Sequence, residues 1–379
     1  MRLTTRGVAL IVCGIALFAA GSLLGHQLVQ ALGGAALAVV VGAALLAAGR
    51  LRVDVEREIH PDRVEAGTTA LARVVVRNPG SRRIPGFAAR DPWPGGFETV
   101  RVRSLASGTT ASHSYELPTE RRGKVPIGPM TLLRDDALGL VRNRITVGPV
   151  TDLHVHPKVR QALVSADGRA HQHHEGPVRT TSMRGSADLR ALRDYVVGDE
   201  PRHVHWKASA RLGKLVVRDM VDPDEPGFTV LLDDRVGALT PEAFEEAVEV
   251  AASLAHASAL TGERTRLCTT AGLDVDTAGG VPAGLRLLDF LCEVGQAEST
   301  GPVDRLVSTG QVGGTLVFVS GGTAASDLRD LSALSRCARG ITVIDVAGNE
   351  YVDAVAGVPR IGAATAIGAI KTWNSGVRV

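Results

Sequence analysis

The residues best suited to chemistry are concentrated in one stretch, residues 184–222, in which charged and apolar side chains alternate. A hydrolase could draw a nucleophile from Ser209, a base from His203 or His205 and an orienting carboxylate from Asp199. A catalytic triad is defined by its geometry, and the spacing of these residues along the chain supplies none. Ser209 also lies outside any G-x-S-x-G turn of the kind that presents a nucleophilic serine. A hydrolase is therefore the alternative interpretation and not the favoured one.

The favoured interpretation gives the same stretch a structural or partner-docking role. Asp199, Arg202 and Arg211 would form buried ion pairs that lock two domains together, because the planar guanidinium of arginine fits a carboxylate with two parallel hydrogen bonds. Trp206, one of only three tryptophans, would be the apolar pin of that junction. The residues assigned to this role are Arg193, Tyr195, Gly198, Asp199, Arg202, Trp206, Ser209 and Arg211.

A second candidate site consists of Asp233 and Asp234, the last two residues of the run GFTVLLDD. In open α/β sheets, ligands bind at the carboxyl ends of strands. Carboxylate oxygens at that position suit Mg²⁺, a hard cation that takes oxygen ligands. Arg235 follows the two aspartates, however, and its charge would repel a metal ion. We therefore predict a degenerate metal site without a cofactor, and Mg²⁺ stays an alternative.

Three histidines, His171, His173 and His174, form a local cluster within residues 160–183. A histidine cluster can bind a transition metal, but a tetrahedral site needs its ligands in a fixed arrangement. Adjacent side chains in a segment of loop composition do not provide one, and no cysteine or carboxylate cluster completes the set. We interpret the segment as a solvated loop near a domain junction.

Two uncharged apolar runs at the start of the chain, residues 7–24 and 28–49, are each close to the ~20 residues that cross a bilayer core. The first run alone could be a secretory signal peptide, since arginines precede it. A second run that follows at once favours a membrane hairpin. Small residues such as Gly33 and Gly34 would let its two helices approach closely.

The arginines around the hairpin indicate its orientation. Arg2 and Arg6 precede it, and Arg50, Arg52 and Arg57 follow it, whereas the short connector contains neither Lys nor Arg. By the positive-inside rule, both ends of the hairpin lie in the cytoplasm. The sequence thus predicts a two-pass protein of the inner or plasma membrane, with both termini and the soluble domains in the cytoplasm.

Length and composition limit the classes of protein that fit. The 379 residues suffice for two domains at about 150 residues each. A net charge of +2, with both signs mixed along the chain, gives no case for nucleic-acid binding. The four cysteines form no C-x-x-C pair, and Cys268, Cys292 and Cys337 lie in apolar surroundings. We expect these three to be buried thiols of a reducing compartment.

Two folds are predicted after the hairpin. Residues 51–158 contain short alternating runs separated by Gly- and Pro-rich turns, which predict an all-β sandwich of immunoglobulin-like type. After residue 223, apolar strands alternate with amphipathic helices, the first of which begins at Thr240 and Pro241. This alternation predicts a mostly parallel, doubly wound α/β sheet. The predicted domains are 1–50, 51–158, a linker and signature segment over 159–222, and 223–379.

The stretch 184–222 resembles the signature of the bacterial family known as domain of unknown function 58, G-x-x-D/E-F/L-x-x-L-R-x-Y-x-x-G-D-x-x-R-x-x-W-x-x-S-A-R. The matching residues are Gly185, Asp188, Leu189, Leu192, Arg193, Tyr195, Gly198, Asp199, Arg202, Trp206, Ser209, Ala210 and Arg211. An earlier run, RRGKVPIGPMTLLRDDALGLV, resembles another of the family's segments, with Ala137 in place of the usual proline.

The resemblance implies a von Willebrand factor A-like domain after the sandwich. In such domains a metal-ion-dependent adhesion site begins with Asp-x-Ser-x-Ser, of which this chain keeps only Asp233 and has Arg235 at the first serine position. The later S/T-D-G turn reads Ser320-Gly321-Gly322, with glycine at the acidic position. A Mg²⁺-dependent adhesion-type binding protein is therefore a third interpretation that the replaced residues argue against.

Family members look like partners of MoxR-type AAA+ ATPases and are often encoded beside transglutaminase-like membrane proteins. The resemblance implies a membrane-anchored adaptor or scaffold, and not an enzyme, that acts in complex assembly or envelope-related processes through protein–protein interaction. Since fold does not fix function, these partners are expectations from the family alone.

Overall fold

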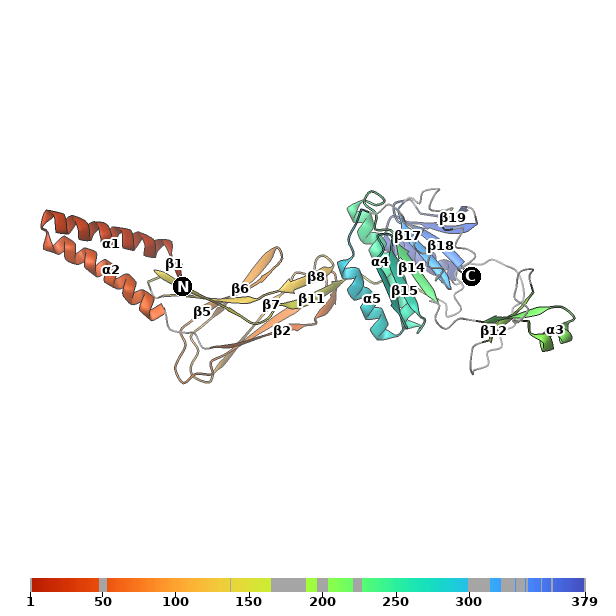
Figure 1. Ribbon diagram of the computed structural model, residues 1–379, viewed down its shortest axis with the longest axis horizontal. Coiled ribbons are helices and arrows are strands. Elements are labelled where there is room, and N and C mark those ends of the chain that lie inside the picture. Colours follow the sequence, from red (N-terminus) through yellow and green to blue (C-terminus); the bar gives the residue numbers. More distant parts are fainter. Residues whose placement is uncertain are drawn as a thin grey trace. The chain divides into compact units, whose positions relative to one another are not determined.

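The computed structural model describes the greater part of the chain. The described residues are 2–47, 53–136, 138–164, 189–195, 204–220, 227–298, 314–321, 331, 338, 340–348, 350–355 and 357–377. The chain divides into two compact units, Met1–His156 and Pro157–Val379 (Figure 1). Each unit buries apolar cores of its own.

The first unit begins with two helices, α1 (Thr5–Leu24) and α2 (Gln27–Ala47), both long and apolar enough to cross a membrane. Thr4 caps α1, since its hydroxyl accepts a hydrogen bond from a backbone N–H of the first turn at 3.1 Å. A side chain at Gly21 or Gly33 would collide with the facing helix. These glycines therefore let the two helices pack closely, as predicted.

The base of the hairpin is tied to the β-sheets of the same unit. The two-residue strand β1 (Arg2–Leu3) pairs antiparallel with β10 (Val141–Val147). The Thr4 N–H donates to the carbonyl of Leu140 at 2.9 Å, and a side chain at Gly7 would collide with that carbonyl. The start of α1 therefore packs directly on the turn that precedes β10.

The rest of the first unit is all β, as predicted. Its other strands are β2 (Asp54–His60), β3 (Arg63–Glu65), β4 (Leu71–Arg77), β5 (Phe87–Trp93), β6 (Gly96–Val102), β7 (Thr110–Glu116), β8 (Gly123–Ile127), β9 (Met130–Asp135) and β11 (Thr151–His156). They form sheets of order β2-β4-β7, β3-β11-β8 and β1-β10-β9-β5-β6. Val74 and Val76 are fully buried at alternate positions of β4 and pack on Phe87 and Leu132 of the five-stranded sheet. Two layers of sheet thus enclose the core.

A buried ion pair crosses this sandwich. Nη1 of Arg57 on β2 donates to Oδ1 of Asp91 on β5 at 2.7 Å, and the two side chains are 7% and 1% exposed. The hydroxyl of Tyr115 on β7 donates to the other oxygen of Asp91. Nη2 of Arg57 donates to the carbonyls of Ile127 (2.9 Å) and Pro149 (2.8 Å). Burial and the bond to Asp91 raise the pKa of Tyr115, so its hydroxyl stays a donor.

The second unit is built around a seven-stranded sheet of order β16-β15-β14-β17-β18-β20-β19. Its strands are β14 (Phe228–Leu232), β15 (Thr265–Thr269), β16 (Asp274–Thr277), β17 (Thr315–Ser320), β18 (Gly340–Asp345), β19 (Tyr351–Val355) and β20 (Val358–Gly362). The strands β16 and β19 run antiparallel at the two edges, and the others are parallel. The mostly parallel sheet that the sequence predicts is therefore present.

One face of this sheet is covered by α4 (Pro241–Leu260), α5 (Val281–Glu293) and α8 (Ala366–Val377), whose apolar residues share a core with β14, β17 and β20. The hydroxyl of Thr240 accepts a hydrogen bond from the N–H of Ala243 at 3.3 Å. Thr240 therefore caps α4, and proline is the first residue of the helix, as predicted.

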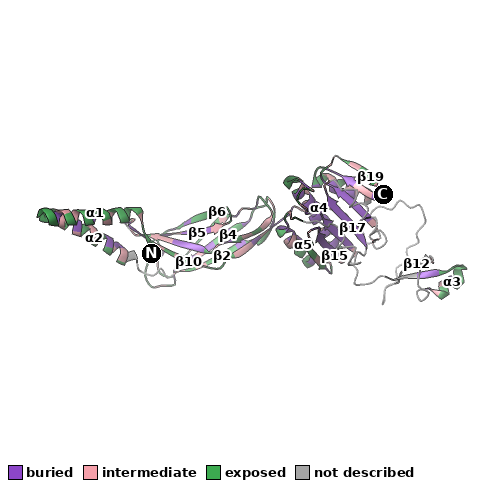
Figure 2. Cartoon of the chain, turned by 45° about the horizontal axis from the view of Figure 1, so that its top comes forward, coloured by how far each residue is buried: buried purple, intermediate pink, exposed green. Residues whose placement is uncertain are grey.

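The central strand β14 is buried along its whole length (Figure 2). Its side chains point alternately to the helical face and to the opposite face, where Leu231 packs with Phe318 and Leu331. Most of residues 325–338 lie outside the described residues.

The first residues of the predicted linker, 159–164, pack on the helices of the second unit. The N–H of Arg160 donates to the hydroxyl of Ser253 on α4 at 2.8 Å. Nε1 of Trp373 on α8, which is fully buried, donates to the carbonyl of Leu163 at 2.8 Å. The α/β unit therefore includes this short segment that precedes its signature.

The cysteines behave as predicted where the structure describes them. Cys268 and Cys292 are buried and form no disulfide, and Cys337 lies outside the described residues. Burial raises the pKa of Cys268 to about 12, so its thiol stays protonated and unreactive at neutral pH.

We expect Arg57→Met to lower the free energy of unfolding of the first unit by about 3–5 kcal/mol, because it leaves the buried carboxylate of Asp91 without its cation. Hydrogen exchange of the β2 and β5 amides in the full chain measures this change. The matched control is Arg63→Met, which removes an exposed pair with Asp62 and should cost less than about 1 kcal/mol. Equal losses in the two variants would show that the buried pair does not hold the sandwich together.

Candidate functional site

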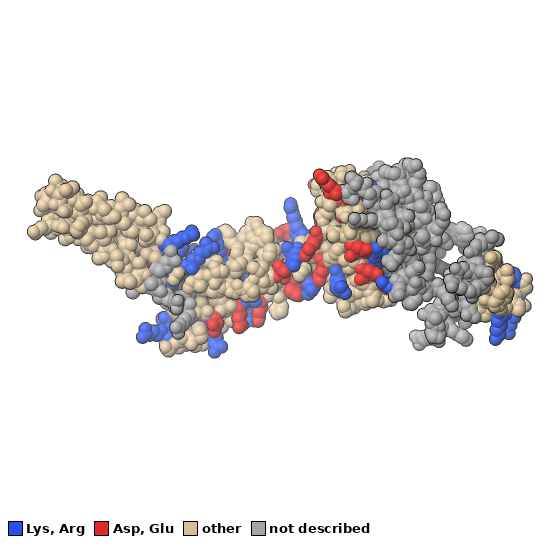
Figure 3. All heavy atoms as spheres, viewed as in Figure 1, with Lys and Arg blue, Asp and Glu red and all other residues tan. Residues whose placement is uncertain are grey.

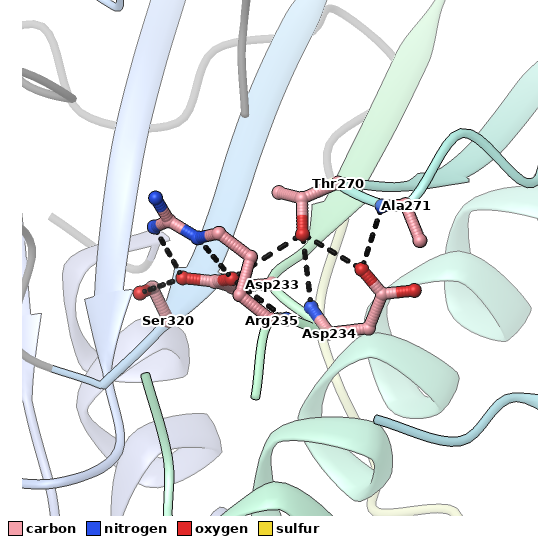
Figure 4. Close-up of polar contacts among 6 residues, drawn as sticks. All are labelled: Asp233, Asp234, Arg235, Thr270, Ala271 and Ser320. Atoms are coloured by element: carbon pink, nitrogen blue, oxygen red, sulfur yellow. Dashed lines mark hydrogen bonds and ion pairs between the residues drawn. The ribbon is translucent and has the colours of Figure 1, made fainter. Parts of the chain in front are cut away.

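The polar residues of the second unit converge at the carboxyl edge of the central sheet (Figure 4). Asp233 follows β14, Thr270 follows β15, and Ser320 is the last residue of β17. Because these three strands are neighbours and run parallel, their carboxyl ends meet at the same edge. The fold therefore places Asp233 where the sequence predicts it, and adds hydroxyl groups from both neighbouring strands.

The carboxylate of Asp233 is completely buried, and both of its oxygens have partners. Nε of Arg235 donates to Oδ1 at 2.8 Å, and Nη2 donates to Oδ2 at 2.7 Å. The hydroxyl of Ser320 donates to Oδ2 at 2.6 Å, and that of Thr270 donates to Oδ1 at 3.3 Å. The guanidinium thus supplies the positive charge at this carboxylate, in a two-pronged geometry.

These contacts set the ionisation of Asp233. Burial by itself would raise the pKa of its carboxyl group, but the hydrogen bonds from Arg235 and Ser320 and the charge of Arg235 outweigh it. The pKa is held below its ordinary value, so the side chain is an anion at neutral pH. A divalent cation at this point would have to displace the arginine from both carboxylate oxygens.

Asp234 points away from this ion pair, toward the loop that follows β15 (Figure 4). Its Oδ1 accepts hydrogen bonds from the hydroxyl of Thr270 and the N–H of Ala271, each at 2.7 Å. Its Oδ2 is buried and has no hydrogen-bond partner among the described residues. Within that part of the chain, no group of three or more His, Cys, Asp or Glu side chains could hold a metal ion.

Sequence reasoning missed two contributors to this edge. The single hydroxyl of Thr270 lies within hydrogen-bond distance of both aspartates, and the only signal for it was its place at the end of the apolar run TRLCTT. At the end of β18, Asp345 accepts a hydrogen bond from the hydroxyl of Tyr351 at 2.9 Å and lies 3.6 Å from Nη2 of Arg360. A second buried carboxylate of the same sheet edge is therefore also paired with arginine.

The signature segment forms a small element of its own in the second unit. Strand β12 (Leu189–Asp194) pairs antiparallel with β13 (Val216–Met220), and the short helix α3 (Trp206–Leu212) precedes β13. The hydroxyl of Ser209 is buried and accepts a hydrogen bond from the N–H of Val216 at 2.9 Å. Nδ1 of His205 accepts one from the N–H at the third position of α3, at 3.0 Å. Both side chains therefore hold α3 in place.

The structure corrects the role predicted for Trp206. Its side chain is 67% exposed on α3, so it is not a buried pin. Lys207 and Arg211 of the same helix are also exposed. The backbone N–H of Tyr195 donates to the carbonyl of Leu215 at 3.0 Å and continues the pairing beyond β12.

Other predicted residues of the signature are not brought together by the described part of the structure. Arg193 lies opposite Val217 in the β12–β13 register. Gly198, Asp199 and Arg202 lie outside the described residues, as does the cluster of His171, His173 and His174. The ion pairs predicted for Asp199, Arg202 and Arg211 stay a prediction.

We expect Arg235→Gln to lower the free energy of unfolding of the second unit by roughly 2–4 kcal/mol at pH 7, because it leaves Asp233 buried as an unpaired anion. The low pKa of Asp233 means that the stability from the pair is present above the ordinary carboxyl pKa and is lost as pH falls through the lowered one. In the variant, the carboxylate of Asp233 is buried without the charge of Arg235, so its pKa should rise. Protonation then removes the buried charge. The difference in the free energy of unfolding between variant and wild type should therefore become smaller from pH 7 to pH 5.

Hydrogen exchange of the β14 and β17 amides measures this deficit. Arg264→Gln is the matched control, since its pair with Asp276 is one-third exposed on both sides and should cost less than about 1 kcal/mol. A deficit that widens on acidification would contradict the assignment of Asp233 as a charged partner of Arg235.

Comparison with known proteins places the signature in a family. Residues 191–343 match the family model described as "Protein of unknown function DUF58". The chain is 26% identical over 237 residues to the "Uncharacterized protein YeaD" of Bacillus subtilis, over 57% of this chain and 56% of that protein. The chain thus spans little more than half the length of this curated relative.

Among solved structures, two domains match parts of this chain. A CARDB domain from Pyrococcus furiosus covers 27% of this chain and 93% of its own, with 22% identity and a TM-score of 0.21. A domain of a putative cell surface protein from Methanosarcina acetivorans covers 31% and 93%, with 13% identity and a TM-score of 0.19. These TM-scores are too low to establish a shared fold. Residues 191–343 therefore match the DUF58 family, as the signature implied, and the chain is similar to YeaD over 57% of its length.

Proposed function

We propose that this protein is a membrane-anchored adaptor that binds a partner protein through its signature segment and has no catalytic activity. The proposed partner is a MoxR-type AAA+ ATPase, with a transglutaminase-like membrane protein as a further component, as the family resemblance implies. The proposed setting is the cytoplasmic side of the inner or plasma membrane, where such a complex would be assembled.

The observation that carries the proposal is the exposure of apolar and basic side chains together on α3. Trp206 is 67% exposed and Leu212 is 59% exposed, next to the exposed cations Lys207 and Arg211. Tryptophan and arginine are enriched among the residues that dominate binding energy in protein interfaces. A partner surface with an apolar pocket and carboxylates at its rim fits this helix.

The same segment gives little support to a hydrolase. A serine nucleophile needs a base within hydrogen-bond reach to activate it. Ser209 instead accepts from the N–H of Val216 and lies 3.4 Å from the carbonyl of the same residue, and Nδ1 of His205 caps α3. These contacts support a structural role for both side chains and leave binding as the better-supported function.

We further propose that the second unit is a von Willebrand factor A-like domain that works without a metal ion, and that the β unit is an immunoglobulin-like spacer. In support, Asp233 lies at the carboxyl edge of a mostly parallel sheet, where ligands bind in such folds. The guanidinium of Arg235 takes both of its oxygens. A Mg²⁺-dependent adhesion site would need those oxygens for the ion.

Affinity purification of the full chain from native membranes, with mass spectrometry of the proteins retained, tests the adaptor role. Wild type should retain an AAA+ ATPase of MoxR type. Trp206→Ala should weaken the interaction by about 2 kcal/mol, or roughly thirtyfold in affinity, since truncation of an interface tryptophan has effects of this size.

The matched control is Val352→Ala on β19, because Val352 is 68% exposed and so as accessible as Trp206. It should retain as much ATPase as wild type. If wild type retains no AAA+ ATPase, or if the two variants lose it equally, the proposed docking role of α3 is wrong.

A further inference from the structure

The length of α1 constrains where the rest of the first unit lies. The helix has 20 residues, and at 1.5 Å per residue it is about 30 Å long, which equals the thickness of the hydrocarbon core of a bilayer. A spanning helix of this length places its ends near the lipid headgroups, and Arg6 in the first turn of α1 fits a position of Thr4 at that level. Because Thr4 is hydrogen-bonded to Leu140, the turn before β10 lies at that level as well.

Arginine side chains gather at this end of the sandwich. Figure 3 shows Lys and Arg side chains where the hairpin joins the β-sheets, beside helices whose outer surface is otherwise uncharged. Arg2 of β1 lies directly opposite Arg142 of β10, so their side chains share one face of the sheet. Arg144 lies two residues beyond Arg142 on β10. It is opposite Leu133 of β9, which is opposite Ala88 of β5, which in turn is opposite Arg101 of β6. Arg144 and Arg101 therefore lie in one row across the sheet.

Three of these four cations have no acidic partner among the described residues. Arg142 is neutralised, since its Nε and Nη2 donate to the two carboxylate oxygens of Asp135 at 2.6 and 2.8 Å. Arg2, Arg101 and Arg144 are exposed and form no ion pair with any residue that the structure describes. This face of the five-stranded sheet therefore carries a net positive charge.

The three-stranded sheet on the other side of the sandwich shows no such excess of positive charge in its cross-strand pairs. On the exposed face of the three-stranded sheet, Arg73 lies opposite Glu58 and Arg77 lies opposite Asp54. Each arginine there faces a carboxylate on the neighbouring strand, as is usual for exposed cross-strand pairs. The unbalanced arginines belong to the sheet that is joined to the hairpin.

An exposed leucine lies at the same end. Leu138 is 58% exposed at the tip of the turn between β9 and β10, next to the base of α1. The carboxylate of Asp136 accepts hydrogen bonds from the N–H groups of Leu138 and Val141 at 2.9 and 2.6 Å. The turn therefore presents an apolar side chain at the level assigned above to the headgroups.

We propose that this end of the β unit, defined by Arg2, Arg101, Arg144 and Leu138, binds the headgroups of anionic phospholipids. Arg144 lies two residues beyond Arg142, about 7 Å along the strand. That distance is within the Debye length of about 8–10 Å over which an anionic membrane surface attracts basic residues. The inference rests on the membrane anchor of the proposed function, and adds a lipid class and a surface that recognises it.

The test uses the full chain in nanodiscs of phosphatidylcholine, with or without phosphatidylglycerol, and follows hydrogen exchange of residues 98–104 and 136–147. We expect several-fold slower exchange in the anionic nanodiscs, and loss of this difference at high salt. The double variant Arg101→Gln, Arg144→Gln should lose it too, whereas the matched variant Arg73→Gln, Arg77→Gln should keep it. Leu138→Ser should weaken the protection of residues 136–147.

Extraction of membranes with alkaline carbonate tests the anchor separately. If the chain stays in the membrane but exchanges equally in both nanodiscs, the lipid-binding proposal is wrong and the anchor stands. If carbonate removes the chain, the anchor is wrong and the lipid-binding proposal fails with it.

Discussion

A buried carboxylate is stable when it is paired with a cation, and each unit contains a buried aspartate that is paired with an arginine. Asp91 and Asp233 are 1% and 0% exposed, and an arginine binds each of them through short hydrogen bonds. Loss of one partner from a buried pair costs several kcal/mol, because the remaining charge is left without solvent. In the sandwich, Arg57 also reaches backbone carbonyls of other strands, so the layers cannot separate without exposing Asp91.

The second pair matters because of where it lies. The carboxyl edge of a parallel sheet is the usual place for a ligand or metal, and Asp233 occupies it. Arg235 lies two residues further along the chain and supplies a cation that cannot be deprotonated or removed by a chelator. In the structure, the guanidinium of Arg235 therefore contacts both oxygens of this carboxylate. We infer that specificity in this protein comes from exposed side chains such as Trp206, and not from exchange of an ion at the sheet edge.

Asp234 differs from Asp91 and Asp233, because it forms no ion pair with a cation among the described residues. Its Oδ1 is satisfied by Thr270 and Ala271, whereas its Oδ2 is buried without a hydrogen-bond partner among the described residues. Unpaired buried oxygens are uncommon in folded proteins and are costly.

Much of the architecture could be predicted from sequence because it depends on local patterns. Two uncharged apolar runs predicted the helical hairpin, and Thr240 with Pro241 predicted the start of α4. The alternation of strands and helices predicted the parallel sheet. These signals lie within a few residues of one another, which is the range over which a sequence pattern can be interpreted without a structure.

The site was harder to predict because its contacts join distant residues. Asp233 was identified by its place after β14, but its bonds come from Thr270 and Ser320, which lie 37 and 87 residues further along the chain. The exposure of Trp206 was predicted wrongly, because composition alone favours burial of a large aromatic residue. That Arg235 repels a metal ion stays a prediction, and its two-pronged bond to Asp233 depends on rotamers that a sequence does not reveal.

Titration of the full chain with Mn²⁺, followed by the electron paramagnetic resonance signal of the free ion, tests most directly whether Arg235 takes the place of a metal. We predict that wild type leaves the free signal unchanged, and that Arg235→Ser, which releases the oxygens of Asp233 and Ser320, binds Mn²⁺. Binding of one Mn²⁺ per chain by wild type, abolished by Asp233→Asn, would contradict this account.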